Sequence, residues 1–409
     1  MTCRFCKTET DSVFIDLINA PASNSFLTFD QLNEPEVFYP LKVFVCPSCF
    51  LVQVDEYKKS DAIFNSDYVY FSSFSKSWLK HSAAYTEMMC GRFGLNEHSL
   101  AMEIASNDGY LLQYFKERNV QVLGIEPTAN TAKVAQEKGI ETIIKFFGVE
   151  LAKELVAQEK YADVLLGNNV LAHVPNIIDF VQGMKIVLKP EGVITMEFPH
   201  LYQLVKHNQF DTIYHEHFSY LSFITVQQIF AACGLKLFDV EELPTHGGSI
   251  RIFAAHEESC VEVEGSVEKM IQKEMEAGMR SLDYYNGFQQ RAQEIKFSFL
   301  KFLLDKKSEG KRIVGYGAAA KGNTLLNYSG VKCDLIDFVV DANPHKQGKF
   351  LPASHIPVVD ESEIRAAQPD FVVLFPWNLK EELMEQLKYI QEWGGKFVIP
   401  IPKIKIINA

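Results

Sequence analysis

The chain has 409 residues, of which 47% are hydrophobic and 22% are charged, and its net charge is −12. This length predicts two or three domains rather than one core, and the acidic balance argues against a nucleic-acid partner, which would require a basic face. The amino terminus carries a cysteine pair instead of an apolar signal sequence, and no apolar window reaches the ~20 residues of a membrane span. We therefore expect a cytoplasmic protein with no membrane partner.

Two CxxC motifs lie in the first fifty residues, and their cysteines are Cys3, Cys6, Cys46 and Cys49. Four thiolates on two tight turns are the ligand set of tetrahedral zinc. Such a site leaves no position for water or substrate, so the zinc is expected to be structural. The interval between the motifs must hold an inserted hairpin or loop, around PASNSFLTF. Redox-active or simply buried cysteines are the alternative.

From Ser99 onward the pattern predicts a strand, a glycine-containing turn, a helix and a second strand that ends at Glu126. A doubly wound unit places its ribose-binding carboxylate at that position. A dinucleotide site favours GxGxxG, whereas EIASNDG has one glycine and acidic groups, which suit the cationic S-adenosylmethionine. A unit that binds no ligand is the alternative. The predicted cofactor-binding residues are Glu103, Ala105, Asn107, Gly109, Glu126 and Asn168.

The stretch FDTIYHEHFSYLS places Tyr214, His215, Glu216 and His217 side by side. Active sites collect titratable groups in this way. Two other interpretations stay open: the side chains could cap the helix expected near Thr225, or the two histidines could bind a metal. In an extended strand the histidines would share one face, away from the glutamate.

The carboxy-terminal third repeats the central pattern. An amphipathic stretch over residues 263–307 leads into KRIVGYGAAAKGNTLLNY, and a second strand ends at Asp341. Gly315, Gly317 and Gly322 imitate a dinucleotide fingerprint, but the downstream spacing is wrong for one. A second α/β domain is predicted here.

The order of these motifs, from Cys3 to about Pro402, resembles the zinc-containing, S-adenosylmethionine-dependent sugar C-methyltransferases of deoxysugar biosynthesis. The most specific parts are YHEH and GAAAKGNTLL. The resemblance implies an α/β protein with a small zinc-binding domain and linker over residues 1–75, a central class I Rossmann-like methyltransferase domain over 76–257, and a Rossmann-like α/β domain over 258–409. The family methylates carbon 3 of nucleotide-linked 4-keto deoxysugars.

The resemblance also implies roles for the histidine cluster. Carbon 3 is adjacent to a carbonyl, so removal of its proton gives an enolate that can accept a methyl group, which requires a base near neutrality. By resemblance His217 is that base, and Tyr214 and Glu216 lie beside it and the keto group. His215 is assigned to the substrate.

Other predicted substrate contacts are spread along the chain. The family places a linker tyrosine in the sugar pocket, which is Tyr68 or Tyr70 here, with core packing as the alternative. Arg251, after a turn expected between the last two strands of the central sheet, could bind a phosphate or sugar oxygen, or could lie on the surface. Lys321 and Asn323, at a helix start, could bind the diphosphate, or the lysine could be solvated.

Two rival functions remain at this point. An O- or N-methyltransferase acting on a nucleotide sugar would use His217 without exchanging a carbon-bound proton. A pyridine-nucleotide-binding or ligand-sensing protein would use the GYGAAAKG turn and keep the central domain as a scaffold. We expect a monomer, because the three segments can cover one another.

Overall fold

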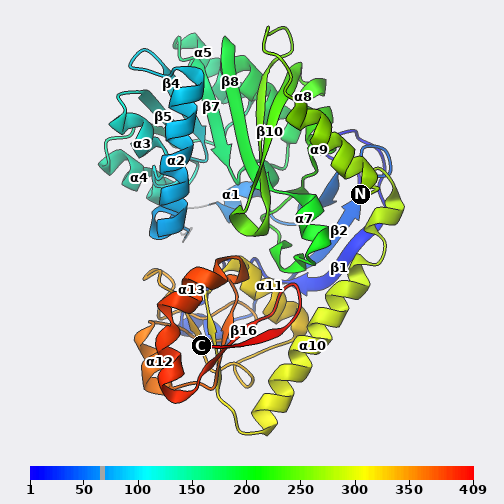
Figure 1. Ribbon diagram of the computed structural model, residues 1–409, viewed down its shortest axis with the longest axis vertical. Coiled ribbons are helices and arrows are strands. Elements are labelled where there is room, and N and C mark those ends of the chain that lie inside the picture. The colour runs from blue at the N-terminus through cyan, green and yellow to red at the C-terminus, as the bar shows by residue number, and fades with distance from the viewer. Residues whose placement is uncertain (65–69) are drawn as a thin grey trace.

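The computed structural model describes residues 1–64 and 70–409, and this part of the chain forms three β-sheets (Figure 1). The sheets have four, seven and six strands. In Figure 1 the seven-stranded sheet occupies the upper half, the six-stranded sheet the lower half, and strands of the four-stranded sheet run along one side toward both. The expected three-part α/β organisation is confirmed.

The four-stranded sheet carries the cysteine motifs at its ends. Its antiparallel strands are β1 (Val13–Ala20), β2 (Tyr39–Val45), β3 (Val52–Val54) and β9 (Ser219–Tyr220). The expected insertion is the long connection from β1 to β2, which contains PASNSFLTF. Because β9 begins two residues after His217, this sheet directly anchors the segment that holds the histidine cluster.

The seven-stranded sheet has the strand order β10-β11-β8-β7-β4-β5-β6, in which β11 alone is antiparallel to the other strands. Its strands are runs of buried apolar residues, as a sheet covered on both faces requires. They are β4 (Leu100–Ile104), β5 (Gln121–Ile125), β6 (Thr142–Ile143), β7 (Ala162–Asn168), β8 (Leu188–Pro199), β10 (Leu235–Leu243) and β11 (Ser249–His256).

Helices cover both faces of this sheet. Their bounds are α2 (Lys76–Phe93), α3 (Leu112–Glu117), α4 (Ala129–Glu137), α5 (Val149–Ala157), α6 (Ile177–Val187), α7 (Leu201–Lys206), α8 (Phe223–Ala232) and α9 (Gly265–Glu276). The last of these lies beyond the predicted limit at residue 257, yet Val267 and Met270 pack into the central core. Helix α9 therefore packs on the central unit, and the boundary at residue 257 stays a prediction.

The six-stranded sheet is parallel except for its last strand. Its order is β14 (Val358–Val359), β13 (Val339–Val340), β12 (Ile313–Tyr316), β15 (Phe371–Leu374), β16 (Lys396–Ile399) and β17 (Lys405–Asn408). Its helices include α11 (Ala320–Ser329), α12 (Ser362–Ala367) and α13 (Lys380–Gln386). The long helix α10 (Phe288–Ser308) runs from the upper to the lower half of Figure 1.

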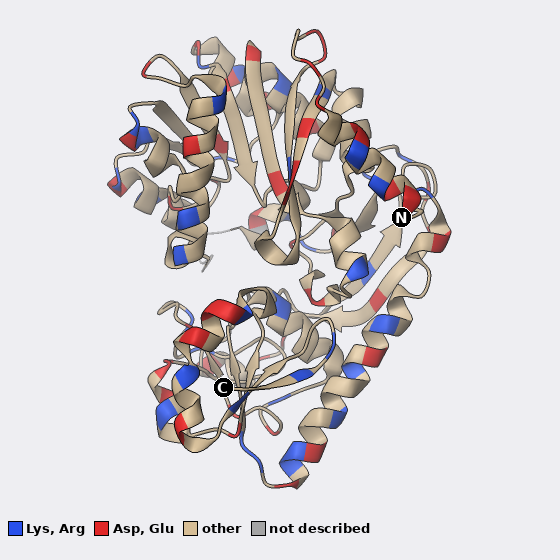
Figure 2. Ribbon diagram, viewed as in Figure 1, with Lys and Arg blue, Asp and Glu red and all other residues tan. Residues whose placement is uncertain are grey.

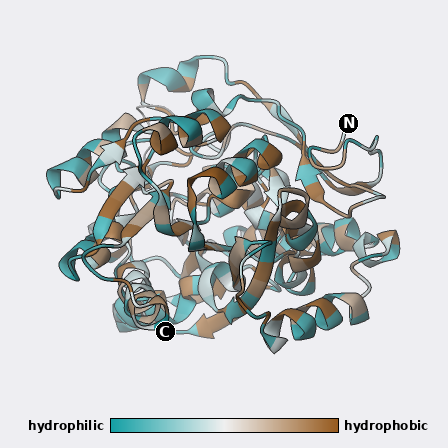
Figure 3. Cartoon of the chain, turned by 90° about the horizontal axis from the view of Figure 1, so that it is seen from above, coloured by the Kyte–Doolittle hydropathy of each residue, from teal (hydrophilic) through white to brown (hydrophobic). Residues whose placement is uncertain are grey.

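One apolar core is shared by the four-stranded and six-stranded sheets. Phe14 of β1 stacks on Phe288 of α10 with ring centroids 4.5 Å apart, and the same core continues through the strands of the six-stranded sheet. Figure 3 shows hydrophilic and hydrophobic residues alternating along the outer helices, as amphipathic helices over a core require. Lys, Arg, Asp and Glu are interspersed over these helices (Figure 2). Among the described helices, none combines the length and apolar character that crossing a membrane demands.

Candidate active site and zinc centre

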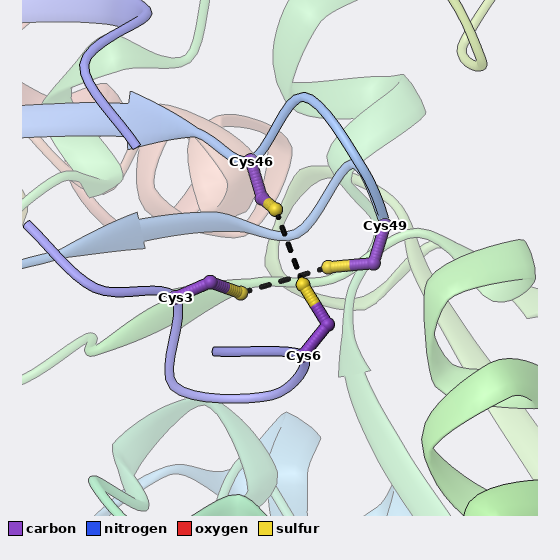
Figure 4. A group of neighbouring side chains, drawn as sticks. All are labelled: Cys3, Cys6, Cys46 and Cys49. Atoms are coloured by element: carbon purple, nitrogen blue, oxygen red, sulfur yellow. Dashed lines mark hydrogen bonds between the residues drawn. The ribbon is translucent and has the colours of Figure 1, made fainter. Parts of the chain in front are cut away.

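The four predicted zinc ligands come together at the ends of the two CxxC motifs (Figure 4). Their sulfurs all lie within 4.8 Å of one another, with 3.6 Å between Cys3 and Cys49 and 3.4 Å between Cys6 and Cys46. Zn–S bonds of ~2.3 Å in a tetrahedron place the sulfurs ~3.8 Å apart, so the group fits zinc. Of the described residues that line the cavity discussed next, none is one of these cysteines. The zinc-binding prediction is confirmed.

A cavity of about 480 Å³ lies where the three units meet. The central unit contributes the carboxyl ends of its parallel strands, which is where ligands bind in open α/β sheets. The amino-terminal part contributes Asn24, and the carboxy-terminal unit contributes Lys321 and Lys346. This volume lies in the range of small-molecule sites, so the cavity can hold parts of both a cofactor and a substrate.

Four of the six predicted cofactor residues line this cavity: Ala105, Asn107, Glu126 and Asn168. Glu126 follows β5 and accepts hydrogen bonds from the backbone N–H groups of Asn107 (2.9 Å) and Thr128 (2.8 Å). Burial raises its pKa, against these hydrogen bonds. Ala105 and Asn107 have positive φ angles of 58° and 49°, so the backbone turns sharply at the end of β4. The turn leaves room for a ligand above it.

Glu103 and Gly109 are not among the described residues that line the cavity. Glu103 is fully buried inside β4, and burial raises its pKa well above the ordinary value. Gly109 has a φ of +74°, and a Cβ there would lie 2.5 Å from Cδ1 of Ile140. Close packing against the connection after α4 explains the glycine. The sequence prediction explained it by a ligand close to the backbone. A cofactor role for both residues stays a prediction.

His217 lies in the cavity with one ring nitrogen anchored. Its Nδ1 is 2.8 Å from the backbone carbonyl of Thr212, and because a carbonyl only accepts, Nδ1 must carry the proton. The other nitrogen, Nε2, then has its lone pair free, and no described residue hydrogen-bonds to it. Burial lowers the pKa of His217 well below its ordinary value, and the neighbouring His173 lowers it further. The ring is therefore neutral at pH 7.

Tyr214 and Glu216 also line the cavity. A turn in which the His217 N–H donates to the Tyr214 carbonyl (3.0 Å) brings the rings of these two residues to 4.0 Å. Glu216 accepts from Nδ2 of Asn24 at 2.7 and 3.0 Å, and burial raises its pKa to about 7. The partner that orients His217 is thus the Thr212 carbonyl, and the glutamate is held separately.

The side chain of His215, predicted to contact the substrate, is directed away from the cavity, so its position does not support that assignment. Its Nε2 lies 3.0 Å from the Pro40 carbonyl and its ring meets Tyr39 edge-on, both in β2. It is absent from the described cavity lining. The turn within the cluster sends neighbouring side chains in different directions, which neither a strand nor a helix pattern could predict.

The position of Arg251 does not support its assignment to a substrate oxygen either, because it is not among the described residues that line the cavity. The strand register places Arg251 directly between Glu241 of β10 and Glu197 of β8. Its guanidinium pairs with both, at 2.9 and 2.7 Å, and it is buried. The turn before it was predicted correctly, but the cross-strand pairing takes up the arginine.

Of the remaining predicted substrate residues, some line the cavity and others do not. Tyr70 and Lys321 line the cavity, and Lys321 donates to Oδ1 of Asn378 at 2.7 Å. Asn323 is buried, donates to the Ser23 carbonyl at 2.6 Å and does not face the cavity, so its substrate assignment is not supported by position. Tyr68 lies outside the described residues.

Several cavity residues were missed by the sequence prediction. His173 follows β7 and its ring is 4.6 Å from that of His217. His246, in the β10–β11 turn with a φ of +55°, meets Trp78 edge-on, and burial lowers its pKa to about 4. Each is an isolated histidine in its stretch of sequence, so neither gives a signal of its own.

In the carboxy-terminal unit the protein itself covers Gly317, whereas Ala319, Ala320 and Lys321 after it line the cavity. A Cβ on Gly317 would lie 2.3 Å from Cγ of Pro376, and the backbone N–H of Ala318 donates to Asp341 at 2.8 Å. Pro376 thus occupies the space beside Gly317 where a pyrophosphate would approach the backbone. This arrangement disfavours the pyridine-nucleotide hypothesis.

Comparison with known proteins identifies the family. The chain is 33% identical over 407 residues to C-methyltransferase NovU of Streptomyces niveus, an alignment that covers 100% of this chain and 97% of that protein. The chain belongs to the C-methyltransferase family. Three family models also match: a zinc binding domain over residues 3–64, a methyltransferase domain over 92–240 and a C-methyltransferase C-terminal domain over 244–402. This C-methyltransferase uses S-adenosylmethionine and binds zinc.

Solved structures match less than half of this C-methyltransferase, at low similarity. The PH0226 protein from Pyrococcus horikoshii OT3 has a TM-score of 0.38 and 14% identity, covering 46% of this chain and 95% of that one. Magnesium protoporphyrin IX methyltransferase from Synechocystis PCC 6803 has a TM-score of 0.34 and 12% identity, covering 44% and 79%. Scores at this level carry no argument about substrate.

Proposed function

We propose that this C-methyltransferase methylates carbon 3 of a nucleotide-linked 4-keto deoxysugar, with His217 as the base that generates an enolate. The observation that carries the proposal is the anchoring of His217. Its protonated Nδ1 is held by the Thr212 carbonyl, so the ring offers an unprotonated Nε2 in the same cavity as Ala105, Asn107 and Glu126. A proton acceptor beside a methyl-donor site is what C-methylation requires.

The proposed reaction begins with proton transfer from carbon 3 to Nε2 of His217. The electron pair of the broken C–H bond enters the enolate, whose oxygen carries the negative charge. Carbon 3 would then form its bond to the methyl group as the methyl–sulfur bond breaks, with that electron pair kept by the sulfur of the departing neutral thioether; the carbonyl is restored, and His217 releases its proton to solvent. S-adenosylmethionine, when bound by the residues around Glu126, supplies the methyl group as an electrophile attached to a sulfonium.

The lowered pKa of His217 has two opposite effects. It keeps the imidazole neutral at pH 7, but it also makes the ring a weaker base, so the enolate oxygen must be stabilised. Glu216 is suited to that task, since a pKa of about 7 leaves a substantial protonated fraction that can donate a hydrogen bond. The Tyr214 hydroxyl, whose pKa burial raises well above the ordinary value, stays protonated and can also donate.

Lys321 is the proposed contact for the diphosphate of the nucleotide. It lines the cavity at the beginning of α11, where the helix dipole also favours an anion. Burial lowers the pKa of Lys321, an effect that Asp211 opposes. A bound diphosphate would add to that opposition, because it favours the charged ammonium.

The test is a carbon-proton exchange experiment in heavy water. Purified protein is incubated with a panel of nucleotide-linked 4-keto deoxysugars, with and without S-adenosylmethionine, and each sugar is followed by proton NMR and mass spectrometry. We expect exchange at carbon 3, gain of one methyl on that carbon, and loss of both in His217→Asn. The matched control is His215→Asn, because His215 is two residues away and faces the Pro40 carbonyl.

If the carbon gains a methyl group but proton exchange at carbon 3 does not depend on His217, the proposed role of this residue is removed. A methyl on another carbon would change the substrate and leave the enzyme class intact. If only His215→Asn loses proton exchange, the base is His215 and not His217.

A further inference from the structure

The anchor of His217 is a backbone atom, so its position depends on the backbone around Thr212. That residue ends the short helix η4 (Phe210–Thr212), which lies between the central and carboxy-terminal units. Asp211, Thr212 and Ile213 are all buried. Whatever holds the residues on either side of Thr212 therefore also holds the imidazole.

Both neighbours of Thr212 are held by side chains of the carboxy-terminal unit. The hydroxyl of Thr324, in α11, donates to the Ile213 carbonyl at 2.9 Å. The indole Nε1 of Trp377, in η7 (Trp377–Leu379), donates to Oδ2 of Asp211 at 2.6 Å. Each of these buried hydrogen bonds joins residues more than a hundred positions apart in the sequence. Together they hold the residues on both sides of the Thr212 carbonyl.

Neither bond is a by-product of local structure. A threonine inside a helix ordinarily bonds the carbonyl four residues earlier, but here the Ala320 carbonyl is 3.4 Å away and the single hydroxyl proton has the closer Ile213 carbonyl at 2.9 Å. Trp377 is fixed by the β10–β11 turn, since a Cβ on Gly247 would lie 2.4 Å from its Cη2. The indole thus has little freedom to leave Asp211.

We propose that Thr324 and Trp377 are positioning residues for His217, through which the carboxy-terminal unit sets the tautomer and orientation of the base. The role of His217 as base rests on the proposed function; the anchoring does not. If either bond is lost, the Thr212 carbonyl moves away from Nδ1, and the imidazole populates the tautomer with the proton on Nε2. That tautomer has no lone pair on Nε2, the nitrogen proposed to accept the substrate proton.

The principal variants are Thr324→Val, which keeps the shape and removes the donor, and Thr324→Ser, which keeps the donor. We expect Thr324→Val to lower the kcat of exchange about tenfold, because small displacements of a catalytic group are costly, with KM for the sugar nucleotide unchanged. Thr324→Ser should restore most of the rate. Trp377→Phe keeps a ring and should lower kcat in the same manner.

The control for general destabilisation is Tyr285→Phe. Tyr285 lies in the same core and its hydroxyl donates to the Met279 carbonyl at 2.9 Å, so this variant also loses one buried hydroxyl-to-carbonyl bond, but remote from His217. We expect it to reduce stability without the fall in kcat.

A second readout is independent of substrate and activity. Nitrogen-15 NMR of labelled histidine, with His217 assigned by its absence in His217→Asn, reports which ring nitrogen is protonated. The wild-type protein should show a protonated Nδ1, and Thr324→Val and Trp377→Phe should show a mixture of tautomers. If the wild-type protein does not exchange the carbon-3 proton of the sugar, but the tautomers of wild type and variants are as expected, the result counts against the proposed function alone. An unaltered tautomer and kcat in both variants would overturn the positioning role.

Discussion

The central and carboxy-terminal sheets start from the same local pattern and end with different uses of it. In each, a buried strand leads through a turn into a helix, and the next parallel strand ends at a carboxylate, Glu126 in one and Asp341 in the other. In the central unit the turn and Glu126 line the cavity. In the carboxy-terminal unit Asp341 is not among the described residues that line the cavity and the glycines are covered, although Ala319, Ala320 and Lys321 after them line that cavity.

The difference lies in the third strand of each pattern. Strand β7 pairs with β4 and ends in Asn168 and Asn169, two polar residues that face the cavity. Strand β15 pairs with β12 in the corresponding way but is followed by Phe375 and Pro376, which occupy the space beside the glycines. A glycine turn therefore predicts the possibility of a ligand, and the residues that follow a neighbouring strand decide whether the space stays open.

The largest expected effect is on the free energy of unfolding, and it concerns Phe375, which covers the glycines of the carboxy-terminal turn. Phe375 is buried, and Cβ atoms added to Gly315 or Gly322 would meet its ring at 2.5 and 3.0 Å. Phe375→Ala should lower the free energy of unfolding by about 3–5 kcal/mol, the range for emptying a packed aromatic site. Denaturant unfolding measures the loss, and Asn169→Ala, in the open turn, is the comparison. Equal losses in the two variants would contradict the contrast between a packed and an open site.

The junction of the two units provides a pH test. Burial raises the pKa of Asp211 from 3.8 to about 6. The folded protein therefore binds this proton more tightly than the unfolded chain, and stability falls as pH rises between these two values, by about 3 kcal/mol. Asp211→Asn should gain stability relative to wild type between pH 4 and pH 7. Denaturant unfolding at several pH values measures the gap, and a gap independent of pH would contradict the assignment.

The smallest expected effect distinguishes the two carboxylates. Glu126→Gln should weaken S-adenosylmethionine binding about tenfold, because charged hydrogen bonds are stronger than neutral ones. Asp341→Asn should leave that affinity unchanged and lower stability by about 1 kcal/mol. Calorimetric titration measures the first result and denaturant unfolding the second. A loss of affinity in Asp341→Asn would mean that the carboxy-terminal turn takes part in cofactor binding.

Sequence patterns predicted the site unevenly, for physical reasons that can be named. The cofactor end follows from the order of strand, turn and strand, because parallel strands bring their carboxyl ends to one edge. Gly109 shows the limit of that argument, since its positive φ serves close packing against Ile140. Arg251 shows another, because strand register surrounds it with Glu197 and Glu241. His173 and His246 come from separate loops, so no local pattern could connect them to His217.

The sequence by itself determined the zinc ligands and the two α/β units, because CxxC spacing, alternation and buried strand runs are local properties of the chain. The tertiary structure decided which member of the Tyr-His-Glu-His cluster faces the cavity. In that turn the direction of each side chain depends on its partner: the Pro40 carbonyl takes His215 away, and the Thr212 carbonyl holds His217 in place. Those partners are themselves fixed by distant elements, β2 for one and the carboxy-terminal unit for the other.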